Sequence, residues 1–207
     1  MPIFEKQGRR IAFIHVPKAA GSSIESMFRN DGWSMTFFRK SMDGFSVSPQ
    51  HMIYSRLRGD IPDLDDLTSF TIIRDPFARL VSEWRYQTEK MKTSDLVFND
   101  FVRHVDCSLK QNIQYWDNHW RPQTDFMDER IDQVFRVENM ADSLPKFLEE
   151  KNIMTNAGIP HTNRRRSGDR NWKRHFKVSS ESRERILRMY DRDYSEFGYD
   201  RIIPVAD

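Results

Sequence analysis

The sequence predicts an α/β domain with a central, mainly parallel β-sheet flanked by helices. Segments typical of buried strands alternate along the chain with segments typical of helices, which is the order of parallel sheets joined by helical crossovers. The length of 207 residues suits one domain with a substantial core, and the 38% of hydrophobic residues can form it. No internal repeat or low-complexity linker divides the chain, so we expect a single domain over residues 1–207.

Four segments carry the β-branched and aromatic residues typical of strands: Ile11–Val16, Met35–Phe38, Ser69–Arg74 and Ile131–Val137. Apolar periodicity predicts helices over Ser23–Arg29, from Asp75 to about Lys92, over Asp95–Val105, over Asp142–Lys151, and from about Ser179 to Tyr194. Asp75 is a suitable N-cap ahead of Pro76, which favours the first position of a helix.

Composition excludes several classes of protein. The net charge of +2 provides no global field for nucleic acid, and the single cysteine, Cys107, allows no disulfide within the chain. No apolar run approaches the ~20 residues of a membrane span, and the N-terminus lacks the apolar core of a signal peptide. The six histidines show no metal-site spacing. We therefore expect a soluble, cytoplasmic protein that binds no metal and no nucleic acid.

The segment IAFIHVPKAAGSSIESMF predicts a strand, a short loop and a helix that opens on Ser22 and Ser23. Backbone N–H groups and the dipole at a helix N-terminus favour an anion, Gly21 lets a phosphate approach closely, and Lys18 adds a positive charge. The alternative is an ordinary strand-to-helix turn with a serine N-cap. The segment is not a Walker A loop, because Lys18 precedes Gly21 instead of following a second glycine.

A second strand-to-helix junction, FTIIRDPFARLVSEW, carries Arg74 at the carboxyl end of a buried strand and Ser82 in the following helix. This edge of an open parallel sheet is where ligands bind. An arginine offers a planar fork of donors to a phosphate, and a serine adds a hydroxyl. The alternatives are an ion pair of Arg74 with a neighbour such as Asp75, and simple packing of Ser82 against the sheet. Together the two junctions favour two phosphate sites.

The pair HVPKAAGSSI and TIIRDPFARLVSEW resembles the two nucleotide-binding motifs of sulfotransferases, most closely those of the heparan sulfate and chondroitin (carbohydrate) branch. Weaker likeness in QHMIYSRL, HWRPQTDF, VFRVENM and RMYDRDYSEFGYD extends the resemblance over about residues 11–200. It implies a P-loop-like, three-layer domain that binds 3′-phosphoadenosine 5′-phosphosulfate (PAPS), yields adenosine 3′,5′-bisphosphate and needs no metal. It also implies that Arg74 and Ser82 bind the 3′-phosphate, and that the 5′ side is bound by Lys18, Ala20, Gly21, Ser22 and Ser23.

The resemblance further implies in-line transfer to a hydroxyl acceptor, a glycan or small carbohydrate, with a base to take the acceptor's proton. His51 lies between the two motifs, where related enzymes place a histidine base. Lys18 is expected to contact the oxygen that bridges sulfate and 5′-phosphate. His15, at the end of the first strand, is expected to orient or bind substrate, and His119 is a third candidate base.

Other candidates lie further along the chain. Members of the wider superfamily that this chain resembles use a glutamate as the base; here Glu83 follows Ser82 directly, and we expect it to face elsewhere. Trp120 and Gln123 are candidates for the acceptor cleft, against the alternative of an ordinary turn before Pro122. The basic segment 163–174, NRRRSGDRNWKR, is a solvated loop, a lid over the nucleotide, or a binding surface for an anionic acceptor such as a sulfated or carboxylated glycan. A family-like segment that closes over PAPS makes Asn163, Arg164 and Ser167 candidates there.

Two other classes of function stay open. An ATP-dependent phosphoryl transferase of related topology would carry a Walker A lysine, which the sequence lacks. A non-catalytic nucleotide- or glycan-binding module would keep the anion cradle without turnover; the presence of Lys18, Arg74, Ser82 and His51 favours an enzyme instead.

Overall fold

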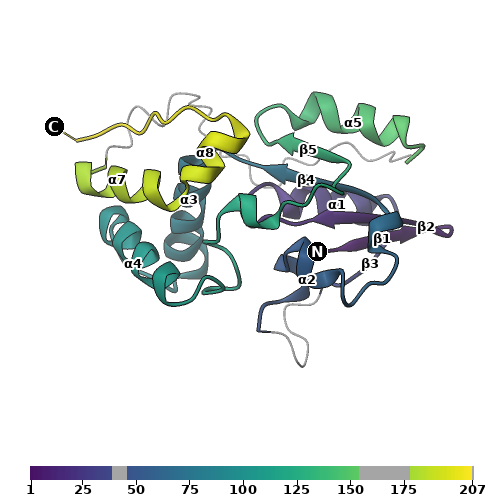
Figure 1. Ribbon diagram of the computed structural model, residues 1–207, viewed down its shortest axis with the longest axis horizontal. Coiled ribbons are helices and arrows are strands. Elements are labelled where there is room, and N and C mark those ends of the chain that lie inside the picture. Colours follow the sequence, from purple (N-terminus) through teal and green to yellow (C-terminus); the bar gives the residue numbers. More distant parts are fainter. Residues whose placement is uncertain (39–45, 154–177, 207) are drawn as a thin grey trace. The chain divides into compact units, whose positions relative to one another are not determined.

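The structure, a computed structural model, describes residues 1–38, 46–153 and 178–206 (Figure 1). Within it the chain forms two compact units, each assembled from separate stretches of sequence. The first unit comprises Met1–Arg74 and Asp125–Arg164, and the second comprises Asp75–Thr124 and Arg165–Asp207. Each unit has its own apolar core. The expectation of a single domain stays a prediction, and the units are described separately below.

The first unit contains a five-stranded sheet in the order β3-β1-β2-β4-β5. Its strands are β1 (Ile3–Lys6), β2 (Arg9–Ile14), β3 (Ser34–Thr36), β4 (Thr68–Ile73) and β5 (Gln133–Arg136). Strands β2, β4 and β5 pair in parallel, with Phe13 opposite Phe70 and Ile72 opposite Phe135. Strand β1 pairs antiparallel with both β2 and β3. The α/β class is confirmed, whereas the expectation of a mainly parallel sheet is corrected to a mixed one.

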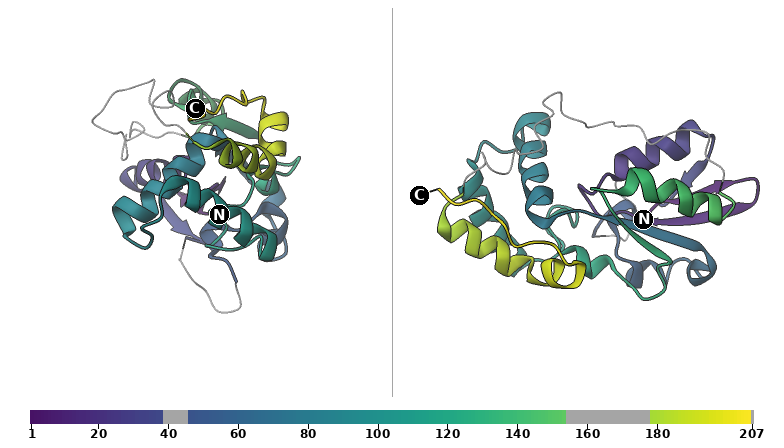
Figure 2. Two further views of the ribbon diagram at one scale, coloured as in Figure 1. Left: turned by 90° about the vertical axis from the view of Figure 1, so that its left-hand side faces the viewer. Right: turned by 90° about the horizontal axis from the view of Figure 1, so that it is seen from above.

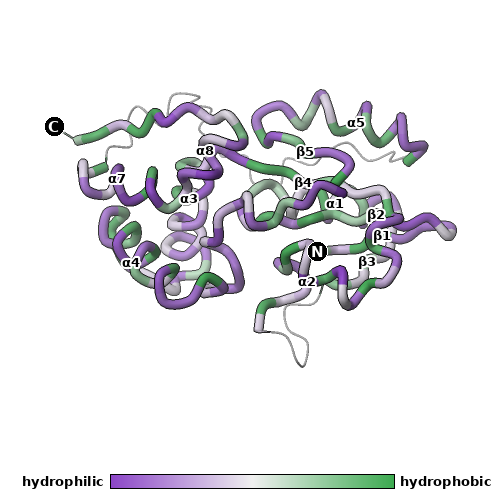
Figure 3. The backbone as a smooth tube through the Cα atoms, viewed as in Figure 1, coloured by the Kyte–Doolittle hydropathy of each residue, from purple (hydrophilic) through white to green (hydrophobic). Residues whose placement is uncertain are grey.

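The antiparallel part arises from a hairpin at the start of the chain, ahead of the first strand expected from the sequence. Gln7 and Gly8 both have positive φ, 51° and 77°, between β1 and β2. Two consecutive residues of positive φ form the turn whose twist matches that of an antiparallel pair. Figure 3 shows this turn as a hydrophilic tip beyond the more apolar strands.

Two helices cover one face of the sheet, α1 (Gly21–Asn30) and α5 (Met140–Glu150) (Figures 1 and 2). Phe28 of α1 stacks on Phe4 with ring centroids 4.0 Å apart, and Phe147 of α5 lies 6.0 Å from Phe70 of β4. Short elements complete the unit: α2 (Tyr54–Leu57) and the 3-10 turns η1 (Pro49–His51) and η2 (Leu64–Asp66). Another 3-10 turn, η4 (Gln123–Phe126), spans the boundary between the units.

The second unit is helical. It contains α3 (Pro76–Arg85), α4 (Phe98–Gln111), α7 (Ser180–Met189) and α8 (Asp191–Phe197). Helix α3 begins as predicted, because the Asp75 carboxylate accepts a hydrogen bond from the Ala78 N–H at 2.7 Å. The predicted continuation to Lys92 is present but winds as a π-helix, η3 (Tyr86–Met91). The predicted last helix is divided into α7 and α8 at Tyr190.

Apolar side chains at helical spacing build the core of the second unit. Helix α4 contributes Phe98, Phe101, Val102 and Val105, all buried, and α3 contributes Phe77, Leu80 and Val81. Among the described residues, none of the helices is both long enough and apolar enough to cross a membrane.

Candidate functional site

The loop between β2 and α1 has an unusual backbone. Lys18 and Ala20 adopt positive φ angles of 67° and 66°, although neither is a glycine. Such conformations cost about 1–3 kcal/mol each and persist where the surrounding structure imposes them, often at functional sites. Ala20 is the N-cap residue of α1, and no side chain caps this helix. The alternative of a serine N-cap is therefore wrong, because the cap residue is an alanine, which has no side-chain oxygen to accept from the first turn of α1.

Position 21 must be a glycine because a neighbouring side chain lies against it, whether or not a phosphate also approaches there. A Cβ atom at this position would lie 1.9 Å from Nε2 of His15 and 2.4 Å from two ring carbons. The imidazole of His15 thus occupies the space that any other residue at position 21 would need. The sequence favours glycine here for phosphate approach or for the backbone freedom of a turn, and it cannot show which side chain lies beside the helix start.

His15 is held by a buried carboxylate. Its Nδ1 lies 2.7 Å from Oε1 of Glu25, and both side chains are only 6% exposed. The amide of Gln50 donates to the same carboxylate oxygen at 2.8 Å. Burial raises the pKa of the Glu25 carboxyl, but the hydrogen bond and charge of His15, the bond from Gln50 and the charge of His51 lower it below its usual range. Glu25 is therefore ionised at neutral pH.

His51, the predicted base, lies beside this group. It ends the turn η1, is buried, and its ring meets that of His15 edge-on with centroids 4.9 Å apart. Its Nδ1 is 3.4 Å from the Ser48 hydroxyl. The structure thus brings together His15 and His51, two of the three candidate histidines of the sequence.

Arg74, which belongs to the second predicted motif, contacts the loop of the first motif within the first unit. It follows β4 directly, and its Nη1 donates to the backbone carbonyl of Lys18 at 3.3 Å. The guanidinium therefore lies at the strained loop, as expected for residues at the carboxyl ends of the neighbouring parallel strands β2 and β4. Among the loop's serines, Ser22 is exposed and Ser23 is buried.

A comparison with protein families matches residues 2–200 to the sulfotransferase family. The chain belongs to the sulfotransferase family. No curated protein and no solved structure matches it closely enough to add a relative. The family includes carbohydrate sulfotransferases, and its match covers both the β2–α1 loop and the β4–α3 junction of this sulfotransferase.

Ser82, the second residue predicted for the 3′-phosphate, lies half-buried on α3 in the second unit of the sulfotransferase. Its neighbour Glu83 is buried and accepts from the Gln87 amide at 2.7 Å. The other Glu83 oxygen lies 3.0 Å from Nδ1 of His119. Glu83 thus points into the second unit and orients His119, which the sequence analysis had considered separately.

Trp120 and Gln123 are both buried in this sulfotransferase. Trp120 is 1% exposed and belongs to the second core, and Gln123 is 0% exposed. The backbone N–H groups of Gln123 and Thr124 each donate to Asp193 at 2.9 Å. We therefore do not assign these side chains to an acceptor site. Asn163, Arg164, Ser167 and the basic segment 163–174 lie outside the described residues.

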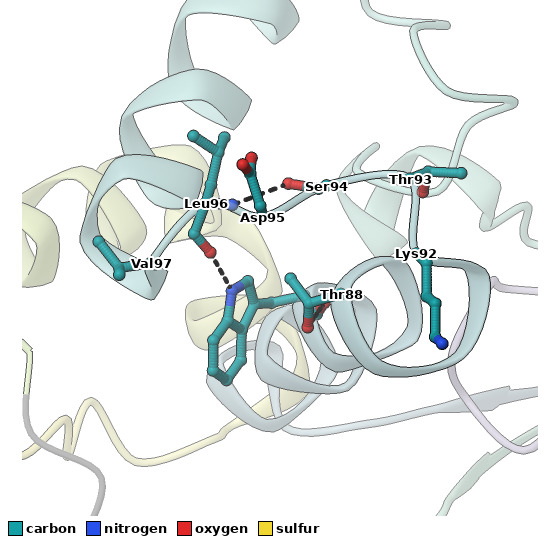
Figure 4. A pocket seen from close by; sticks show the side chains of 8 residues that line it. Thr88, Lys92, Thr93, Ser94, Asp95, Leu96 and Val97 are labelled. Atoms are coloured by element: carbon teal, nitrogen blue, oxygen red, sulfur yellow. Dashed lines mark hydrogen bonds between the residues drawn. The ribbon is translucent and has the colours of Figure 1, made fainter.

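The second unit has a cavity of about 560 Å³, which differs from the β2–α1 loop in the charges that line it (Figure 4). It is lined by Trp84, Thr88 and the segment 92–97. Its polar groups bond to one another, since the Trp84 indole N–H donates to the Leu96 carbonyl at 2.8 Å and the Leu96 N–H donates to Ser94 at 3.3 Å. Its charged residues, Lys92 and Asp95, are opposite in sign. The lining therefore lacks the excess of positive charge that the β2–α1 loop gains from Lys18 and Arg74.

Two residues of the site escaped the sequence analysis, Glu25 and Gln50. Glu25 had a usable signal: it stands one position after Ile24 and three before Phe28, on the apolar face of α1. A carboxylate on a face that packs into the core needs a partner. Gln50 had no such signal, because only the folded chain brings η1 to α1.

Proposed function

We propose that this sulfotransferase moves the sulfuryl group of PAPS to a hydroxyl of a carbohydrate acceptor by in-line displacement. The observation that carries the proposal is the β2–α1 loop. It combines two left-handed residues, a helix N-terminus whose N-cap residue is Ala20, and the residues Lys18 and Arg74. Backbone donors, a dipole and two cations at one place suit an anionic group such as a nucleotide phosphate.

The residues present fit PAPS. Lys18, Ala20, Gly21, Ser22 and Ser23 are proposed to bind its 5′ side, and Arg74 and Ser82 its 3′-phosphate, as in the motifs that this chain resembles. The donor supplies an activated sulfuryl group, and the chain's own residues provide the charges around it. Lys18 is proposed to stabilise the negative charge that grows on the bridging oxygen.

His51 is proposed to take the proton of the acceptor hydroxyl. Its ring is held between Ser48 and His15 and lies in the same unit as Lys18. An imidazole fixed by its neighbours is a suitable general base near neutral pH. The carbohydrate nature of the acceptor is supported by the motif resemblance alone.

Thermal stabilisation separates the three classes of function. We expect adenosine 3′,5′-bisphosphate to raise the melting temperature, because a ligand at 100 times its Kd adds ~2.7 kcal/mol of stability. ATP with Mg²⁺ and AMP serve as comparison ligands. A shift with ATP–Mg²⁺ and none with the bisphosphate would overturn the proposal in favour of a phosphoryl transferase.

Transfer itself is tested with labelled PAPS and a panel of glycans and small carbohydrates. Label on an acceptor hydroxyl supports the enzyme. Binding of the bisphosphate with no transfer to any acceptor of the panel would favour the non-catalytic binding module.

A further inference from the structure

A single buried carboxylate contacts both segments that carry the proposed catalytic residues. Oε1 of Glu25 lies 2.7 Å from Nδ1 of His15 and 2.8 Å from Nε2 of Gln50. His15 follows β2 and leads into the loop of Lys18, and Gln50 directly precedes His51 in η1. Glu25 itself belongs to α1, whose N-terminus forms the other side of the loop.

Apolar side chains already supply packing on the face of α1 that carries Glu25. Its neighbours on the same helix face, Ile24 and Phe28, are fully buried in the first core. Burying an ion pair commonly costs as much as it returns, and an apolar side chain of similar size often stabilises a protein equally well. The presence of an ionised group on this face therefore calls for a role beyond stability.

The geometry fixes the orientation of His15. Because a carboxylate oxygen only accepts hydrogen bonds, the Nδ1 atom of His15 carries the hydrogen in this contact. The opposite atom, Nε2, is then the one that faces Gly21 at the start of α1. The ring also touches His51 edge-on. A change in the tilt of His15 would move both the loop and the proposed base.

We propose that Glu25 is a positioning residue for sulfuryl transfer, holding the Lys18 loop through His15 and the His51 turn through Gln50. This inference rests on the function proposed above. Within the described part of the chain, the titratable groups that act on Glu25 are His15, from the end of β2, and His51, from η1. Glu25 contacts no substrate in this scheme and acts only through these neighbours.

Glu25→Gln is the principal test, because glutamine keeps the length and one acceptor oxygen but removes the charge. We expect the Kd for adenosine 3′,5′-bisphosphate to change less than about threefold and kcat to fall at least tenfold. We also expect the acid limb of the kcat–pH profile to move to lower pH, since a nearby negative charge favours the protonated imidazole. An unchanged kcat and pH profile would overturn the inference.

Asp31→Asn is the matched control. Asp31 is a buried carboxylate at the other end of α1, bonded to Lys6 and to the Trp33 indole, each at 3.0 Å. The Asp31→Asn variant should have a lower melting temperature than the wild type but the same dependence of kcat on pH. If it moves the profile as Glu25→Gln does, the effect is general destabilisation and the positioning role is rejected.

A readout without turnover keeps the inference separate from the proposed function. The ring ¹⁵N signals of His15 and His51 are recorded in the wild type, in Glu25→Gln and in Glu25→Ala. We expect both histidines to change in both variants, whether or not the wild type transfers sulfate. Unchanged His51 signals in the two variants would refute the coupling between Glu25 and His51. If the signals change as expected but the wild type transfers no sulfate, only the proposed function is refuted.

Discussion

At the scale of single residues, the site is shaped by what lies against each backbone position. Lys18 and Ala20 adopt left-handed backbone angles that are strained for residues with a Cβ atom, whereas the absence of a Cβ atom at Gly21 leaves room for the His15 ring. The small residues of PKAAGSS thus have different physical roles.

Gly21→Ala should destabilise the protein. The added Cβ would lie 1.9 Å from His15 Nε2, and overpacking of this kind costs about 1–3 kcal/mol. Chemical denaturation measures the loss. Gly59→Ala is the matched control, since its Cβ would meet only the Arg56 carbonyl at an ordinary 3.7 Å. In a double variant with His15→Ala the cost should shrink; full additivity would contradict the assigned contact.

Lys18→Ala should reduce kcat by about 100-fold or more while weakening bisphosphate binding much less. The expected split follows from a contact that strengthens as charge develops in the transition state. Steady-state kinetics and calorimetric titration measure the two quantities. Lys146→Ala, which removes an exposed lysine of the same unit, should leave both unchanged. An intact kcat in Lys18→Ala would remove the lysine from the mechanism.

At the scale of elements, helices are fixed by a few charged contacts as well as by apolar faces. In the second unit, Asp106 of α4 is only 2% exposed and accepts from Lys110 at 3.1 Å and from Arg188 at 2.8 Å, with Arg185 also bonded. Arg185 and Arg188 belong to α7, so one carboxylate ties two helices together. Burial raises the pKa of Asp106, but the bonds from Lys110, Arg188 and Arg185 lower it below its usual range.

Asp106→Asn should lower the free energy of unfolding by about 2 kcal/mol at neutral pH. A depressed pKa means that the contribution is present above the ordinary carboxyl pKa and is lost as the pH falls through the folded-state value. The difference between wild type and variant should therefore be fully present above about pH 4 and decline only at lower pH, as the carboxylate becomes protonated in the folded state. Denaturation across pH measures it. Asp100→Asn, a half-exposed partner of Arg103 on the same helix, should cost under about 0.5 kcal/mol at any pH.

At the scale of the whole molecule, the two units are interlaced along the chain. The sequence passes between them at 74/75, 124/125 and 164/165, so neither unit is one continuous segment. Each has a separate aromatic core, with Phe28 in the first and Phe101 in the second. Because each unit is built from two separate segments of the chain, we expect both units to unfold in a single cooperative transition.

Phe28→Ala and Phe101→Ala test this expectation of a single domain. Each should destabilise by about 3–5 kcal/mol, and each should shift the same single transition in calorimetry and circular dichroism. Ile202→Ala, at a side chain that is 70% exposed, serves as the control with little effect. Two transitions, each moved by only one of the variants, would show that the units are independent domains.

Local sequence signals predicted much of the fold. Strand β4, the Asp75 cap of α3 and the strand–loop–helix of the site follow from apolar patterning and capping chemistry, and all are present. The π-helical continuation of α3 and the hairpin of β1 were missed, because each depends on packing or turn geometry that a short window of sequence does not specify.

The sequence alone determined the family-like pair of motifs and the positions of Lys18, Arg74 and His51 within it, since motif chemistry is local. Tertiary structure decided which residues act together. It placed Arg74 on the Lys18 carbonyl, the His15 ring against Gly21, and the Glu25 carboxylate between two segments distant in sequence. Such contacts depend on the packing of α1 and η1 around β2, and a linear pattern carries no information on which buried polar groups meet.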